Sequence, residues 1–255
     1  MACWPCPCAP GCSQIPLALL APKILLAVGG WLGLVLVGVS YQVVPLFNVS
    51  RVRPRWPWPV LGLLVGGLLL GVIALAVDLP PPVRAAALVP YVGGAALYLH
   101  DVVRLTRARG RSAIAGITPV GEVAAAVVFL AASTAALPAV AGLQPWPQVA
   151  VTSALLGWAP LAISANGARI FPFLAWKRAG VPGAAPLAAD RIPIAAGRGQ
   201  LLLLGLGWLL LEAGVLTRSV PSTRTGAVLS LLGALALPIL IALALSGRLP
   251  RQARR

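Results

Sequence analysis

Long apolar runs, separated by short arginine-rich loops, dominate the pattern of this chain. The apolar residues come in continuous blocks, without the alternation of a half-buried strand or the single stripe of a surface helix. A run of about 20 apolar residues crosses a bilayer as a helix. Each run has to be helical because lipid offers the backbone no hydrogen-bond partners. We therefore predict an all-α, polytopic transmembrane helical bundle of about seven spans. The expected spans are 22–46, 58–79, 83–103, 119–142, 148–174, 199–217 and 225–246.

The composition agrees with a membrane domain. Of the 255 residues, 59% are hydrophobic and 10% are charged, whereas a soluble domain averages about 25% charged residues. The mean hydropathy is +0.93. We expect a disordered, Cys- and Pro-rich extramembrane segment at 1–21, a transmembrane helical domain at 22–247, and a basic cytoplasmic tail at 248–255.

The basic residues predict the orientation. The formal net charge of +15 could suggest nucleic acid, but the Lys and Arg residues lie in loops at the ends of the spans, so we exclude that partner. Fifteen of the 20 fall on one face and four on the other, while Arg169 lies within the fifth span. The positive-inside rule then places the amino terminus outside and the carboxyl terminus in the cytoplasm. We expect a bacterial, multi-pass inner-membrane protein whose partners are the lipid bilayer and a membrane protein or a second copy.

The four cysteines lie together in the amino-terminal MACWPCPCAPGC. A zinc or iron–sulfur site could use such spacing. However, no His, Asp or Glu lies nearby, and prolines crowd the segment. The segment also lacks the basic start and apolar core of a signal peptide. We therefore predict no metal there and leave open whether the segment is a disordered tip or a misassigned start.

Polar residues within the spans are costly in lipid, so each is a candidate for function or for packing. One group lies near the predicted cytoplasmic ends of the spans: Tyr41, Gln42, His100, Asp101, Glu122, Asn166 and Arg169. Two interpretations are open. The group could line a polar cavity open to the cytoplasm, or Glu122 and Arg169 could form an interfacial ion pair with side chains reaching toward water. We favour the ion pair, since these two residues have opposite charge and lie at similar depth.

His100 is the only histidine and Met1 the only methionine. Haem in membrane helices is commonly held by such ligands, so we expect no haem, no other cofactor and no metal. Glu212 stands alone in LLLLGLGWLLLEAGVLT, where a neutral carboxyl is cheaper than a charged one. It could bind a proton or a cation, or it could reach the outer interface near Arg218. No Ser-His-Asp set or phosphate-binding glycine loop appears, so no catalytic residue is predicted.

Two further patterns concern packing and symmetry. Glycines spaced by four residues allow helices to approach closely; such pairs are Gly29 with Gly33, Gly62 with Gly66, and Gly67 with Gly71. In addition, GWLGLVLVGVSYQVVPLF in span one aligns with GWAPLAISANGARIFPFL in span five. Trp31 matches Trp158 and Pro45 matches Pro172 at one offset of 127 residues. Since both spans run in the same direction, they would form a parallel repeat, and duplication and coincidence both remain open.

The motifs in residues 30–47 and 167–178 resemble those of little-characterised bacterial polytopic membrane proteins with a GVSYQVVPMF-type sequence. Those proteins are distantly similar to haem–copper oxidase subunit one and to NnrS-type membrane proteins. The oxidase core binds haem and copper through several histidines, which this chain lacks at matching places. The resemblance therefore implies a membrane protein related to respiratory or metal-handling systems, without oxygen or nitric oxide chemistry.

These observations lead to one main functional hypothesis and two alternatives. We expect an accessory or assembly component without a redox cofactor, and an enzyme is the less favoured class. A small-molecule permease with a polar site near the cytoplasmic face is the first alternative. A haem-binding membrane enzyme is the second, and the histidine count argues against it.

The charge distribution generates a topology prediction. Reporter fusions after residue 111 and at residue 255 should read cytoplasmic, and a fusion near residue 144 should read external, because arginine-rich loops stay inside. Alkaline phosphatase and fluorescent-protein fusions measure this directly. An external carboxyl terminus would contradict the seven-span topology.

Overall fold

The computed structural model describes residues 17–48, 53–108, 117–179 and 193–245, and these residues form helices joined by short turns. In chain order the helices are α1 (Leu17–Ile24), the π-helix η1 (Leu25–Leu32), α2 (Gly33–Asn48), α3 (Pro57–Ala76), α4 (Pro81–Arg107), α5 (Ile117–Val140), α6 (Trp146–Thr152), the π-helix η2 (Ser153–Trp158), α7 (Ala159–Ala179), α8 (Ile194–Thr217) and α9 (Val220–Leu245).

The prediction of seven spans is confirmed. Within the described ranges, seven continuous helical stretches are long and apolar enough to cross a bilayer. Spans one and five each combine an α-helix, a π-helix and a second α-helix. The chain is therefore an integral, multi-pass membrane protein. Two spans were predicted too short: α4 continues to Arg107 and α8 begins at Ile194, because the polar turns at these helix ends carry little hydropathy signal.

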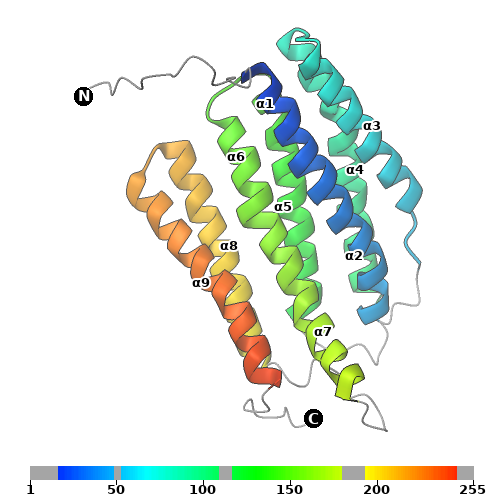
Figure 1. The fold of residues 1–255 in the computed structure, drawn as a ribbon, viewed down its shortest axis with the longest axis vertical. Helices are drawn as coiled ribbons and strands as arrows, with labels where there is room; N and C mark the ends of the chain where they lie inside the picture. Colours follow the sequence, from blue (N-terminus) through cyan, green and yellow to red (C-terminus); the bar gives the residue numbers. More distant parts are fainter. Residues whose placement is uncertain (1–16, 49–52, 109–116, 180–192, 246–255) are drawn as a thin grey trace, which may run out of the picture.

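The helices form a bundle with α5 and the α6–η2–α7 span in its middle (Figure 1). The α8–α9 hairpin packs on one side of this pair, and α1–η1–α2, α3 and α4 pack on the other (Figure 1). The four cysteines and the basic tail from residue 248 onward lie outside the described residues.

Tight turns close three helix ends. Asp78, Gly142 and Arg218, which follow α3, α5 and α8, all adopt a left-handed backbone conformation with φ between 53° and 82°. In each turn the next amide donates to the carbonyl five residues earlier, at 2.9–3.0 Å. This bond satisfies a helix-terminal carbonyl that lipid could not. The α3–α4 and α8–α9 hairpins are therefore fixed by their own backbones.

Glycines allow the helices of both hairpins to touch. A Cβ added to Gly67 would lie less than 3.0 Å from the backbone of Tyr91, and one added to Gly207 would meet Ser230 in the same way. Each hairpin also packs a buried leucine onto a glycine of the partner helix, Leu64 on Gly94 and Leu204 on Gly233. Gly62 and Gly66, by contrast, face open space. Of the two glycine pairs in α3, only Gly67 with Gly71 therefore contacts another helix.

Spans one to three (α1–η1–α2, α3 and α4) and spans five to seven (α6–η2–α7, α8 and α9) form two three-helix units that share further features. The offset of 127 residues that aligns Trp31 with Trp158 also places η2 inside the range of η1. Both units thus begin with a span widened by a π-helix and continue with a hairpin closed by a left-handed residue. The paired tryptophans differ, however, because Trp31 is 75% exposed and Trp158 only 1%.

We predict that Gly67→Ala lowers the free energy of unfolding by about 1–3 kcal/mol, because the new methyl group would collide with the backbone of α4. Gly66→Ala is the matched control and should be neutral or slightly stabilising, as alanine favours a helix over glycine. Thermal or denaturant unfolding in detergent measures both. Equal losses from the two variants would contradict the close packing of α3 on α4.

Candidate functional site

The candidate residues from the sequence divide into three places. Tyr41 lies at one end of the bundle in contact with Asp101, whereas Gln42 and His100 are exposed. Glu122 and Asn166 are buried, and the Asn166 side-chain amide donates to the carbonyl of Ala162 in its own helix at 2.9 Å. The side chain of Arg169 lies outside the described residues, so its pairing with Glu122 stays a prediction. Glu212 lies in the opposite half of the bundle.

Asp101 organises the first of these places. Its carboxylate is only 1% exposed and accepts hydrogen bonds from the amide of Trp56 at 3.0 Å, the amide of Arg55 at 3.4 Å and the hydroxyl of Tyr41 at 3.2 Å. Trp56 immediately precedes α3, where a helix favours negative charge. Asp101 therefore joins α4 to the end of span one and the start of span two. This role is structural.

His100 lies beside this contact, on the outside of the same helix. It lines a shallow, open depression together with Arg104 and Arg107 of α4. In the described part of the chain, no group of three His, Cys, Asp or Glu residues is placed to hold a metal ion. The depression is a basic surface at the end of a span, the location in which arginine reaches lipid head groups and water.

Glu212 makes a compact polar contact between spans five and six. Its Oε1 lies 2.7 Å from the hydroxyl of Thr152 and 2.8 Å from that of Ser153, and the indole nitrogen of Trp208 lies 3.1 Å from the Ser153 hydroxyl. Glu212 is 7% exposed. The two hydroxyls sit where α6 changes into η2, so the carboxyl meets a widened helix.

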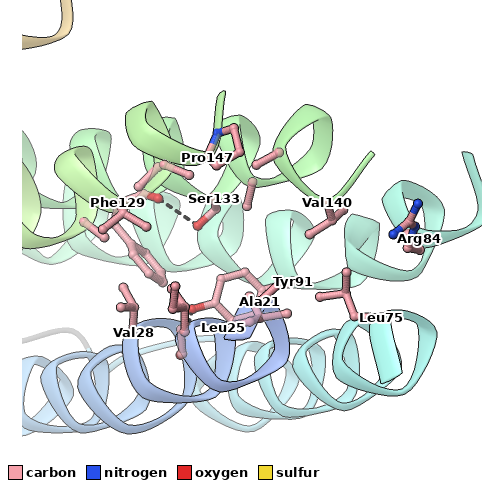
Figure 2. Close-up of a pocket in the computed structure, with 18 of the residues that line it drawn as sticks. Ala21, Leu25, Val28, Leu75, Arg84, Tyr91, Phe129, Ser133, Val140 and Pro147 are labelled. Carbon is pink, nitrogen blue, oxygen red and sulfur yellow. Dashed lines mark hydrogen bonds between the residues drawn. The ribbon is translucent and has the colours of Figure 1, made fainter. Parts of the chain in front are cut away.

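A cavity of about 340 Å³ lies in the same half of the bundle as the α3–α4 hairpin. Figure 2 shows Leu25 and Val28 on one side of it, Phe129 and Ser133 on another, and Arg84 at one end. Its walls come from α1, η1, α3, α4, α5, α6 and η2. The lining is mostly apolar, and small side chains of α5, α6 and η2 create the space: Ala132, Ala136, Ala139, Ala150 and Ala154.

Arg84 supplies the positive charge of this cavity. Its Nη1 lies 3.5 Å from a carboxylate oxygen of Asp78, which is 89% exposed, so water weakens this pair. The Nε of Arg84 is buried and has no hydrogen-bond partner among the described residues. Two other polar groups of the cavity are occupied: Tyr91 donates to the carbonyl of Gly29 at 2.9 Å, and Ser133 to that of Phe129 at 2.7 Å (Figure 2). The buried indole nitrogen of Trp158, which also lines the cavity, has no hydrogen-bond partner among the described residues.

Sequence reasoning missed the cavity and counted Arg84 only as one of the four basic residues on the predicted outer face. The available signal was the run of alanines in α5, combined with a basic residue one turn into α4. Nothing in the sequence indicates that α5 faces η1 and the start of α4, because these segments are far apart in the chain.

Comparisons with known proteins add no relative to this picture. No protein-family model matches the chain, and neither a curated protein nor a solved structure matches it.

We predict that Asp101→Ala lowers the free energy of unfolding by about 1–3 kcal/mol, because it removes the acceptor of two backbone amides and a hydroxyl. The neighbouring, exposed His100→Ala is the control and should change it by less than about 0.5 kcal/mol. Thermal unfolding of the purified variants in detergent provides the comparison. A loss in the His100 variant as large as that in the Asp101 variant would contradict the structural role of Asp101.

Proposed function

We propose that this protein is an accessory or assembly component of a membrane-protein system. We also propose that it binds the acyl chain of an anionic lipid in the cavity beside Arg84. The observation that carries this proposal is an apolar cavity with a guanidinium group at one end. The resemblance in residues 30–47 suggests a bacterial inner membrane and a relation to respiratory or metal-handling systems. In the topology predicted from the basic loops, the Arg84 end of the cavity lies at the outer face of the membrane.

The shape and lining of the cavity suit a hydrocarbon chain. Its volume of about 340 Å³ falls at the lower end of the range for small-molecule sites, about 300–1,000 Å³. Leu25, Val28 and the alanines of α5 and α6 offer dispersion contacts and no hydrogen bonds. A chain inserted there would exchange lipid neighbours for protein neighbours, so apolar contact alone gives little preference.

The preference comes from Arg84. It lies in the first turn of α4, next to the hairpin, and therefore near the membrane surface. A planar guanidinium with a free Nε can bind a phosphate through two parallel hydrogen bonds. The exposed carboxylate of Asp78 at 3.5 Å is a weak competitor. An anionic phosphate in place of water would satisfy the buried nitrogen.

The central aromatic side chains favour a binding protein over the permease alternative. Tyr91, Phe129 and Trp158 border the cavity, and each is at most 5% exposed. A permease needs a polar route to the midplane, whereas these rings present apolar surface there. At the other end of the bundle, Tyr41 and Asp101 are engaged in helix contacts, whereas Gln42 and His100 are exposed. A permease therefore remains the second candidate, and a haem-binding enzyme the third.

Native mass spectrometry of the purified protein in mixed phosphatidylglycerol and phosphatidylcholine tests the proposal. We expect one phosphatidylglycerol to be retained under activation that removes phosphatidylcholine. Arg84→Gln should reduce this preference about tenfold, the effect of one charge-assisted hydrogen bond. Ala136→Phe should remove the bound lipid because the ring fills the cavity.

Ala96→Phe is the matched control, since Ala96 is exposed on α4 away from the cavity lining. It should retain the lipid as the unchanged protein does. Equal retention of the two lipids by the unchanged protein, or the same loss in the Ala96 and Ala136 variants, would overturn the proposal.

A further inference from the structure

The hydrogen bonds around the buried carboxyl of Glu212 need one more hydrogen than its neighbours supply if that carboxyl is ionised. Three neighbouring groups carry one hydrogen each: the indole of Trp208 and the hydroxyls of Ser153 and Thr152. The Trp208 hydrogen points to the Ser153 oxygen at 3.1 Å, and Ser153 then donates to Glu212 Oε1 at 2.8 Å. Thr152 is left with a single hydrogen.

That hydrogen cannot serve both close contacts of Thr152. Its hydroxyl oxygen lies 2.7 Å from the carbonyl of Gln148 and also 2.7 Å from Glu212 Oε1. A carbonyl only accepts, so Thr152 donates to Gln148 if both contacts are hydrogen bonds. The hydrogen between Thr152 and Glu212 must then come from the carboxyl group itself.

A neutral carboxylic acid completes a directed chain. With the proton on Oε1, Trp208 donates to Ser153, Ser153 donates to Oε1, and Thr152 donates to the carbonyl of Gln148. The 2.7 Å contact between Thr152 and Oε1 would then be donated by the carboxyl group rather than by the hydroxyl. The second carboxyl oxygen, Oε2, is buried without a hydrogen-bond partner among the described residues. An unpartnered carbonyl oxygen is tolerable there, whereas half of an anionic charge would be costly.

Among the described residues, no basic side chain is paired with Glu212. Residues 146–158, which form α6 and η2 against Glu212, contain no charged or histidine side chain. Arg218 at the end of α8 and Arg224 in α9 lie toward the hairpin turn, six and twelve residues along the chain. Gly121, which precedes Glu122 in α5, packs on Leu201, and Leu201 lies about 16 Å along α8 from Glu212.

We propose that Glu212 is a membrane-embedded proton-binding site, occupied by a proton at neutral pH and held by the hydroxyls of Thr152 and Ser153. The ligand is H⁺, which converts the carboxylate into a carboxylic acid with no other change in bonding. The site lies between α8 and the α6–η2 segment and outside the cavity, whose lining includes Ala154 and Trp158 but not Glu212, Thr152 or Ser153. It is therefore independent of the proposed lipid site.

Infrared difference spectroscopy of the full chain in vesicles tests this proposal. At neutral pH the unchanged protein should show the carbonyl stretch of a protonated carboxylic acid, shifted in D₂O, that is missing from Glu212→Gln. Glutamine can donate and accept in the same places, so this variant should fold and melt like the unchanged protein. No difference in the carboxylic-acid region between the two proteins would overturn the proposal.

Sodium and a carbodiimide distinguish a proton site from the alternatives. A band that disappears at neutral pH on addition of sodium, but not potassium, would show a sodium site and overturn the proposal. Dicyclohexylcarbodiimide, which is membrane-soluble, should modify Glu212: the carboxyl proton moves to a carbodiimide nitrogen as the carboxyl oxygen bonds to the carbodiimide carbon. A water-soluble carbodiimide should modify Asp78, which is 89% exposed, and spare Glu212. Equal modification of both by the water-soluble reagent would contradict the buried, neutral state.

Discussion

The stacking of Phe129 against Trp158 joins the centre of the bundle. Their ring centroids are 4.3 Å apart, and Tyr91 and Tyr98 pack edge-on against Phe129 at 6.0 and 5.9 Å. Tyr98 in turn meets Tyr41 of α2 at 5.8 Å. Four spans thus share one set of interlocking rings, and such pairs contribute about 0.5–1.5 kcal/mol each beyond burial. The cavity lies on one side of these rings and Asp101 on the other, so both depend on their placement.

Outside this centre, small residues and a few polar contacts hold the helices together, as expected where lipid removes the hydrophobic drive for association. Glycine contacts join the helices within each hairpin. Polar contacts join spans that do not belong to the same hairpin. Asp101 binds span three to span one, and Glu212 binds span six to span five. The two acidic residues lie in opposite halves of the bundle and differ in their partners. Asp101 accepts from two backbone amides and a hydroxyl, whereas Glu212 contacts two hydroxyls, and we propose that it carries a proton.

The two three-helix units show how similar backbones acquire different roles. Both contain a π-helix at the matched position, and π-helices often mark functional positions. In span one the π-helix forms a wall of the cavity through Leu25, Val28 and Gly29, and its Trp31 is exposed. In span five it buries Trp158 against Phe129 and places Ser153 beside Glu212. The second π-helix therefore borders both proposed sites, with a different face turned to each.

The sequence by itself determined the fold class and the number of spans, because hydropathy is a local property and the thickness of a bilayer fixes the length of each run. It also singled out Glu212 and Tyr41, since an intramembrane polar residue is conspicuous among apolar neighbours. Only the tertiary structure decided what these residues contact. Asp101 meets amides some 45 residues away in the chain, Glu212 meets hydroxyls 60 and 59 residues away, and no local pattern encodes such pairings. The cavity likewise exists only because alanines of α5 and α6 face η1 and α4, an arrangement set by how seven similar apolar helices pack rather than by any one of them.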